Sequence, residues 1–534
     1  MRKFIHRHLG LVLYLVMFFF GAYVLWYGYG QHLFAPPRPG MDQHSILECA
    51  LALAKGKLPV EHYRYSYSYT IFLTLAALVA GGKLWLMRLL QLAVAALIPA
   101  VVYRTARLCR TGKPAAFLAG MLCCASAPLV LISLDFLRAA PLALAFVSML
   151  YFLLAAEFRR GRGEQRKADL LVAAAGACGA LCILGRENFL AVVCWAPLLL
   201  WLARDRRGAA VFCGTLLVPL AAVLVFNGIR YHSFQLVPGN VGNILGFYGG
   251  ASGEAANARN VVFSVPGHLR DMALSFELDN SLSVYAHREI ITPLKILCLP
   301  FNLLWILGAA GAVLHRRERG ARWCAVFAGA YVASMLFFTV FYRFRVPVIP
   351  LLAVLAAGAF RHFYLMWRSR RFWVLAAWMV GVAALFAATW VSPDARRSPE
   401  ERLDVALVLV HNRRIAEAED YLEDLTRRGV DTRECWLALV RRLVDDRRLD
   451  EAEECFGRME KLGADPRSGR LLVVQRLVDD RRFPEAEAYL EEMTRRGIDA
   501  RAGWLYLALV LRDSGDISGA KKAFSRFEAL SQPR

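Results

Sequence analysis

The most regular feature of the sequence is a series of long apolar runs in its first three quarters. Between residues 9 and 391, runs of roughly 14–22 apolar residues alternate with short polar segments, and about 20 such residues suffice to cross a bilayer as a helix. The last 140 or so residues contain no such run. The pattern predicts an all-α, polytopic membrane protein with a soluble C-terminal tail.

Eleven membrane spans are expected from these runs. Their limits follow from the apolar stretches and from the charged loops that separate them. They are Leu9–Tyr29, Leu84–Tyr103, Ala115–Leu134, Pro141–Ala156, Leu170–Leu184, Phe189–Leu202, Ala209–Asn227, Leu294–Leu314, Cys324–Phe341, Val346–Phe360 and Phe372–Val391.

Basic residues gather in every second loop, which orients the chain. The N-terminus carries Arg2, Lys3 and Arg7, and such residues stay on the cytoplasmic side of a membrane. Because the number of spans is odd, the tail is expected outside the cytoplasm. The expected location of the protein is a bacterial inner (plasma) membrane. The basic loops are 104–113, 159–167, 204–207, 316–322 and 361–371.

The composition changes this picture little. The net charge of +21 raises the question of nucleic acid, but the excess arginines lie in the short loops between spans, so topology explains them and no nucleic-acid partner is expected. The 12 cysteines include no Cys-x-x-Cys pair. No cofactor and no bound metal are expected, although a divalent ion remains open.

The tail repeats itself every 34 residues. Ala418, Ala452, Ala486 and Ala520 mark the period, and the segments around them are close copies of one another. A helix–turn–helix unit of this length is typical of tetratricopeptide repeats, which stack into an α-solenoid with a concave surface. The tail either docks a protein partner or serves as a structural appendage.

Three segments are therefore expected along the chain. A membrane domain covers residues 1–391, a linker covers 392–404 and the repeats cover 405–534. Two outer loops of the membrane domain are long, at Gly30–Lys83 and Gly228–Pro293. The short apolar segment Thr70–Ala80 is expected to lie in the interface within the first of these loops, because it is too short to span.

Asp42 opens an amphipathic stretch, Ile46–Lys55, after a segment rich in proline and glycine. A carboxylate held at a membrane surface can act as a general base on a hydroxyl group. Asp before a helix can equally cap its free N–H groups. The two interpretations are compatible.

This layout resembles membrane glycosyltransferases of the GT-C type, in particular the glycosyltransferase family 39 and protein O-mannosyltransferase group. The resemblance covers roughly residues 5–365 and depends on the order of several motifs: the acidic first outer loop, RLLQ at the start of the next span, LISLDFLRAAP, LGRENFL, the Gly- and Asn-rich segment 239–255 and FYRFRVPVIPLL. Protein mannosyltransferases carry Asp-Glu in the first loop, whereas Gln43 follows Asp42 here.

The resemblance implies the transfer of a sugar from a polyprenyl-phosphate-linked donor to an extracytoplasmic acceptor, which could be a glycan, a lipid or a protein. It implies that Asp42 is the base and that Asp135 is a second catalytic acid. Arg64 takes the place of a lysine found in aminoarabinose-transferring members. The residues expected to bind lipid phosphate or substrate are Arg64, Arg138, Arg186, Asn243, Tyr248, Arg343 and Arg345.

Three other functions are compatible with the sequence. A polytopic transporter or lipid flippase would place ionisable groups near the middle of the membrane, whereas the acids here lie at the mouths of the spans. An oligosaccharide ligase or polymerase would share the topology and the lipid-phosphate substrate. A scaffold whose repeats alone act would need one span as an anchor, so eleven spans argue against it.

Overall fold

The computed structural model of the chain describes residues 8–30, 34, 37, 42–57, 66–232, 258–274, 288, 291–297, 299–336, 342–391, 399–411, 413–463 and 465–531. These residues contain helices and no strands, which confirms the expected all-α class. The chain divides into two compact units, 1–396 and 397–534. The first repeat helix begins at Pro399, inside the segment that was expected to be a linker.

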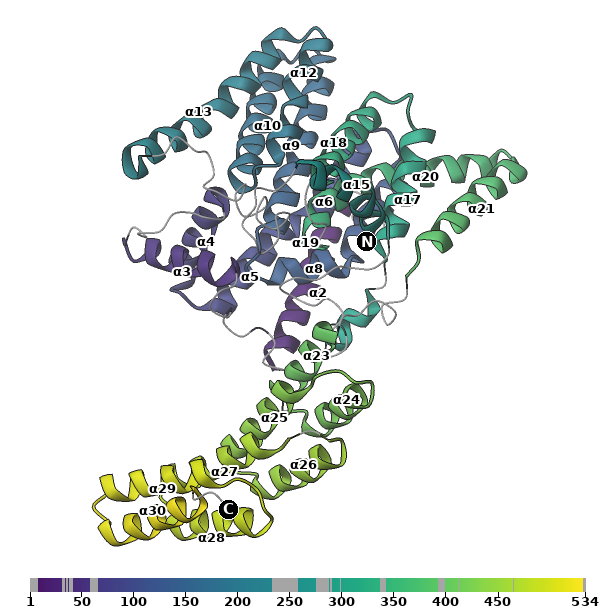
Figure 1. Cartoon of the computed structure of the whole chain (residues 1–534). Coiled ribbons are helices and arrows are strands. Elements are labelled where there is room, and N and C mark those ends of the chain that lie inside the picture. Colours follow the sequence, from purple (N-terminus) through teal and green to yellow (C-terminus); the bar gives the residue numbers. More distant parts are fainter. Residues whose placement is uncertain are drawn as a thin grey trace. The chain divides into compact units, whose positions relative to one another are not determined.

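The membrane unit is built from helices of very different lengths (Figure 1). Its elements are α2 (Leu9–Gly30), α3 (Asp42–Ala54), α4 (Tyr67–Ala80), α5 (Leu84–Ala95), α6 (Leu97–Leu108), α7 (Lys113–Cys124), α8 (Ala127–Leu134), α9 (Ala139–Arg160), α10 (Gln165–Gly185), α11 (Phe189–Val193), α12 (Trp195–Leu202), α13 (Arg206–Tyr231), α15 (Ala258–Ala273), η1 (Thr292–Ile296), α17 (Phe301–Leu314), α18 (Arg319–Met335), α19 (Tyr342–Arg345), η2 (Val346–Val348), α20 (Ile349–Arg368) and α21 (Phe372–Thr389).

Within the described residues, eight helices are long and apolar enough to cross a membrane, and a ninth span results if the bent pair α7–α8 counts as one. These nine match nine of the eleven expected spans. The other two, Phe189–Leu202 and Cys324–Phe341, correspond to the shorter α11–α12 segment and to α18. Tyr67–Ala80 is also a shorter apolar helix, in keeping with its expected place outside the set of spans.

The bend between α7 and α8 has a local cause. The two helices meet at 56°. Ser126 accepts a hydrogen bond from the amide of Leu129 at 3.4 Å and so caps a new helix. Pro128 has no N–H to continue the helix before it. All residues of α8 are buried, so the break lies inside the protein and is shielded from lipid.

An aromatic cluster links the centre of the membrane unit to the segment before α20. Phe146 of α9 meets Phe189 of α11 edge to face at 5.2 Å between ring centroids. Phe189 lies 5.1 Å from Tyr331 of α18. The Tyr331 hydroxyl then donates a 2.9 Å hydrogen bond to the carbonyl of Phe344. Tight aromatic packing of this kind fixes the position of α19 and of the arginines on it.

The outermost helix of the unit, α21, buries only Val382. Its Trp373 is 90% exposed, and several other large apolar side chains on α21 are exposed too. A helix that is apolar all round but little covered by protein is suited to contact with lipid.

The repeat unit consists of successive helix pairs (Figure 1). The predicted 34-residue period is confirmed, with Trp436 and Trp504 fully buried at equivalent positions. Each Trp indole N–H points to a threonine hydroxyl ten residues earlier, Thr426 or Thr494. The helices are α23 (Pro399–His411), α24 (Ile415–Arg427), α25 (Arg433–Asp445), α26 (Leu449–Lys461), α27 (Arg467–Asp479), α28 (Phe483–Arg495), α29 (Arg501–Asp513) and α30 (Ile517–Ser531).

In the repeat that lies between those of Trp436 and Trp504, both the tryptophan and its threonine partner are replaced. Arg470 stands at the tryptophan position and is 3% exposed, while Glu460 stands at the threonine position. Arg470 donates to Glu460 and to Glu453, each at 3.1 Å, and its guanidinium lies 4.9 Å from the ring of Phe456. A buried arginine is tolerated here because two carboxylates and a ring face take the place of water.

Changing Arg470 should therefore destabilise the repeat unit. Arg470→Ala removes charge-assisted bonds to two half-exposed carboxylates, so we expect a loss of about 2 kcal/mol and a melting temperature lower by several degrees. Arg470→Trp combined with Glu460→Thr copies the neighbouring repeats and should recover most of that loss. Thermal melts of residues 397–534, followed by circular dichroism, measure both effects.

Arg467→Ala is the matched control, because Arg467 lies on the same helix and is exposed. It should change the melting temperature by less than a degree or two. A fragment that melts without cooperativity, or an Arg470→Ala fragment as stable as the parent, would contradict this account of the repeat.

Candidate active site

Asp135 lies in a turn that several polar side chains hold from different helices. It ends α8, is 7% exposed, and its Oδ1 accepts the amide of Phe136 at 2.8 Å. Gln43 of α3 donates from Nε2 to Asp135 Oδ2 at 3.2 Å. This contact joins the first outer segment to the end of the bent span, across 92 positions of sequence.

Gln91 of α5 supports the same turn from the main-chain side. Its Nε2 lies within hydrogen-bond distance of the carbonyl oxygens of Ile132, Ser133 and Asp135. The last carbonyls of a helix have no partner within it, so Gln91 supplies one for α8. In turn, the hydroxyl of Tyr69 donates to Gln91 Oε1 at 2.6 Å, which fixes the orientation of the amide.

Arg88 lies one helical turn before Gln91 and is 2% exposed. It donates to the hydroxyl of Tyr29 at 3.2 Å and to the carbonyl of Phe34. Its guanidinium also lies 4.6 Å from the ring centroid of Phe136. Burying a charged arginine side chain costs free energy unless the side chain is bonded. Through these partners, Arg88 connects α2, α5 and the turn after α8.

Beside this turn, three of the expected arginines converge. Arg138, Arg186 and Arg343 line one small cavity of about 20 Å³, which is roughly the space of one water molecule. Ile46, on the helix that begins at Asp42, lines it as well. The structure thus brings together α3, the N-terminus of α9, the end of α10 and α19, although these lie far apart in the sequence.

Arg186 and Arg343 both lie against the ring of Phe344. Their guanidinium carbons are 3.6 Å and 5.1 Å from its centroid. Arg186 makes no ion pair among the described residues, and it is half-buried just after the end of α10. Burial lowers the pKa of Arg186; Tyr331 counters this, and the neighbouring Arg343 cation lowers it further. An anion placed in the cavity would relieve that repulsion.

Arg345 is directed elsewhere, although it lies only two residues after Arg343. It is 1% exposed and donates to the carbonyls of Leu274, at 3.3 Å, and Asp271. Its guanidinium lies 4.9 Å from the ring of Phe301. Arg345 therefore ties α19 to the C-terminal end of α15.

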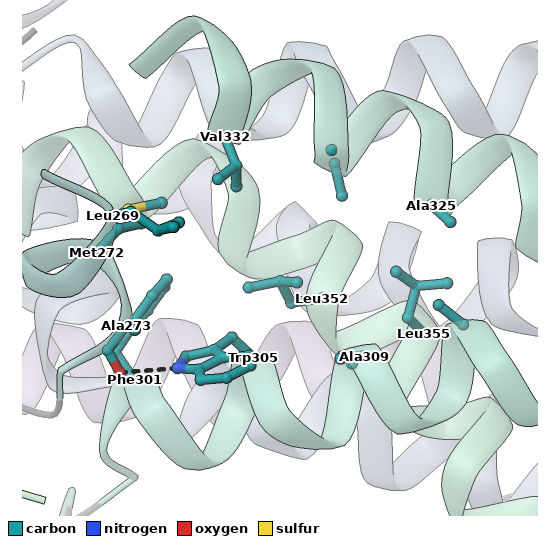
Figure 2. A pocket seen from close by; sticks show the side chains of 14 residues that line it. Leu269, Met272, Ala273, Phe301, Trp305, Ala309, Ala325, Val332, Leu352 and Leu355 are labelled. Atoms are coloured by element: carbon teal, nitrogen blue, oxygen red, sulfur yellow. Dashed lines mark hydrogen bonds between the residues drawn. The ribbon is translucent and has the colours of Figure 1, made fainter. Parts of the chain in front are cut away.

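Phe301 forms part of a second, larger cavity (Figure 2). This space of about 330 Å³ lies between α15, α17, α18 and α20 and is almost entirely apolar. Trp305 lines it and donates from its indole N–H to the carbonyl of Ala273 at 2.8 Å, which anchors α15 at its rim (Figure 2). Small residues on the facing helices leave the space open; they are Gly308, Ala309, Ala312, Ala325, Ala328 and Gly329.

Some expected site residues cannot be placed. Arg64, Asn243 and Tyr248 lie outside the described residues, as does the side chain of Asp42. The backbone of Asp42 is described as the first residue of α3, one residue before Gln43. Among the described residues, no group of three or more His, Cys, Asp or Glu side chains could hold a metal ion.

The sequence did not single out Gln43, Arg88 and Gln91 as site residues. A usable signal existed for two of them. Arg88 and Gln91 are three residues apart on one face of an otherwise apolar span, and polar residues inside a span are costly unless they serve a purpose. Gln43 has no such signal, because it lies in a polar loop where any residue is tolerated.

The PPR repeat family model matches residues 434–463. No curated protein matches the chain. Two solved structures of ArnT from Cupriavidus metallidurans are similar to it. The apo form has a TM-score of 0.44 and 17% identity, covering 86% of this chain and 77% of that one.

The second ArnT structure is bound to undecaprenyl phosphate. It has a TM-score of 0.41 and 16% identity, and it covers 87% of this chain and 77% of that one. Both TM-scores are below 0.5, so neither structure assigns a role to residues of this chain.

The three arginines around the small cavity should bind a phosphate group, for which the water-sized space has to widen, and Arg186 allows a test. Arg186→Gln removes one charge-assisted contact, so we expect the affinity for a short-chain polyprenyl phosphate to fall about 10- to 100-fold. Titration of the purified protein in detergent measures this affinity. Arg319→Gln is the control, since Arg319 also stacks on a ring, that of Trp323, but pairs with Glu157. Equal affinity of the Arg186 variant and the parent would rule out the cavity as the phosphate site.

Proposed function

We propose that the membrane unit transfers a sugar from a polyprenyl-phosphate donor to an acceptor on the extracytoplasmic side of the membrane. The observation that carries this proposal is the convergence of Arg138, Arg186 and Arg343 beside Asp135 and the start of α3. Cations for a leaving phosphate and carboxylates for an acceptor hydroxyl are the two requirements of such a transfer.

The reaction would divide between these groups. The bond between the anomeric carbon and the phosphate oxygen breaks, and a new bond forms between that carbon and the acceptor oxygen. The acceptor proton passes to a carboxylate, for which we propose Asp42. The lipid phosphate leaves with its negative charge, which the arginines would stabilise more strongly as it grows. No metal ion is needed in this scheme.

The apolar cavity would take part of the polyprenyl chain. Arg343, at the arginine cavity, and Arg345, against Phe301 of the apolar cavity, are two residues apart on α19. A lipid whose phosphate lies at the first could therefore extend its chain toward the second. The volume of about 330 Å³ is in the range of small-molecule sites and suits a section of an isoprenoid chain.

The orientation and the tail complete the proposal. The alternation of basic loops supports an N-terminus in the cytoplasm and repeats outside, on the side where the acceptor would be met. The repeat unit would then dock a protein partner, while the sugar and the acceptor are left to experiment. The direct test is release of undecaprenyl phosphate, the lipid named in one ArnT structure, from undecaprenyl-phosphate sugars added to the purified protein.

Asp42→Asn tests the proposed base. Asparagine keeps the size of the side chain and caps a helix about as well as aspartate, so folding should be unchanged. Turnover should fall by about 10²–10⁴-fold, the usual contribution of a general base. The same exchange at Asp135 should cost less if that acid orients other groups. A folded Asp42→Asn protein that transfers sugar at the parental rate would return Asp42 to a capping role alone.

Gly329→Leu tests the lipid cavity. A Cβ at Gly329 would meet no atom within 4 Å, so a leucine can enter the cavity without disturbing the helices around it. We expect weaker binding of undecaprenyl phosphate, by about tenfold, and little change for inorganic phosphate. Gly381→Leu is the matched control, because Gly381 also has open space around it but lies on the exposed α21. Unchanged lipid affinity in the Gly329 variant would place the chain elsewhere.

A further inference from the structure

Gln43 combines three properties that the chemistry of the site leaves unexplained. It is the second residue of α3, directly after Asp42, and it is 3% exposed. Its Nε2 donates to Asp135 Oδ2, and its Oε1 is buried with no hydrogen-bond partner among the described residues. Burying an amide with one half unsatisfied is costly, so the bond that it does make has to repay that cost.

Asp135 is a rigid partner for this bond. Its Oδ1 is occupied by the amide of Phe136 and its carbonyl by Gln91. The hydroxyl of Tyr69 donates to Gln91 and fixes its amide, and Arg88 lies over the ring of Phe136, the residue after Asp135. Contacts from α4, α5 and the end of α8 therefore fix the position of Asp135 Oδ2. Because Gln43 bonds to this oxygen, the first turn of α3 is held relative to the same three elements.

The start of α3 has few other anchors. The apolar residues that pack α3 against α4 and α5 begin at Ile46 and continue with Leu47 and Ala50. They hold the body of the helix and leave its first residues to polar contacts. His44, next along the chain, bonds to the carbonyl of Pro37 at 3.0 Å and pairs with Glu48, so it is a further polar anchor of this turn, but one that makes no contact with Asp135 in these bonds.

We propose that Gln43 is a positioning residue, which through its hydrogen bond to Asp135 fixes the first turn of α3 and so the place of Asp42. The role of Asp42 as base rests on the proposed function, whereas the coupling of Gln43 to Asp135 does not. A base displaced by about 1 Å loses much of its effect on the chemical step, while a donor bound by the arginines is held as before.

The first test removes the bond. Gln43→Leu keeps the bulk but loses the donor, so hydrogen exchange of the peptide covering Asp42–Cys49, followed by mass spectrometry, should speed up in the full-length protein. In the assay of undecaprenyl phosphate release, kcat should fall about 10- to 100-fold with KM for the lipid-linked donor nearly unchanged. A merely structural role would instead reduce the amount of folded protein or alter both constants together.

The second test exchanges the donor and acceptor of the hydrogen bond between residues 43 and 135. Gln43→Glu sets two carboxylates against each other and should resemble or exceed the effect of Gln43→Leu. Adding Asp135→Asn lets the asparagine amide donate to the introduced carboxylate. The double variant should then regain the slow exchange of the parent and a kcat equal to that of Asp135→Asn alone. The control is Gln165→Glu, because Gln165 donates to Asp169 at 3.0 Å in an exposed pair outside the site, and both readouts should stay unchanged.

The outcomes distinguish the proposed sugar transfer from the proposed positioning role of Gln43. Failure of the parent protein to release undecaprenyl phosphate from any donor overturns the proposed function, while faster exchange in Gln43→Leu and its reversal in the double variant still establish the coupling. Unchanged exchange in Gln43→Leu overturns the positioning role. Faster exchange together with an unchanged kcat overturns it as well, because the turn would then move without affecting the chemistry.

Discussion

The bent span α7–α8 imposes the constraint on which the rest of the candidate site depends. A break in a helix frees N–H and C=O groups that lipid cannot satisfy. Here Ser126 caps the new helix and Gln91 bonds to the carbonyls at its end. Gln91 acts at the far end of α8 from the break, where the short helix ends in the polar turn at Asp135 and side chains of α3 and α5 gather. The bend thus shortens α8 inside the protein, and the candidate acid lies in the turn where that short helix ends.

Much of the fold was predictable because the membrane dictates it. Apolar length and loop charge predicted the helical class and nine spans of the length found, since both follow directly from the cost of burying polar groups in lipid. The two short segments were not predictable in the same way. The α11–α12 segment has the expected bounds but is shorter than the length that crosses a bilayer, and its apolar composition alone does not reveal how it would lie in the membrane.

The site was predictable in part for a similar reason. Arginines at the outer ends of spans are conspicuous, and the structure brings Arg138, Arg186 and Arg343 to one cavity. Arg345 looked equivalent to Arg343 in the sequence, yet the tight turn of α19 directs it to carbonyls at the C-terminal end of α15. Side-chain direction in a single helical turn changes by about 100° per residue, so two residues separate the roles. Gln43 was hidden because its partner lies in another loop.

The repeats and the membrane unit solve the problem of a buried charge differently. Arg470 replaces a tryptophan, and its neighbour in space changes with it from threonine to glutamate, so the charge is neutralised by the protein itself. Arg186 lies close to Arg343 across a shared phenylalanine ring; burial lowers the pKa of Arg186, and the Arg343 cation lowers it further. In the first arrangement the counter-charges belong to the fold itself. In the second, an anion held beside Arg186 would offset the repulsion from Arg343, which is why Arg186 is the residue at which the proposed phosphate site can be tested.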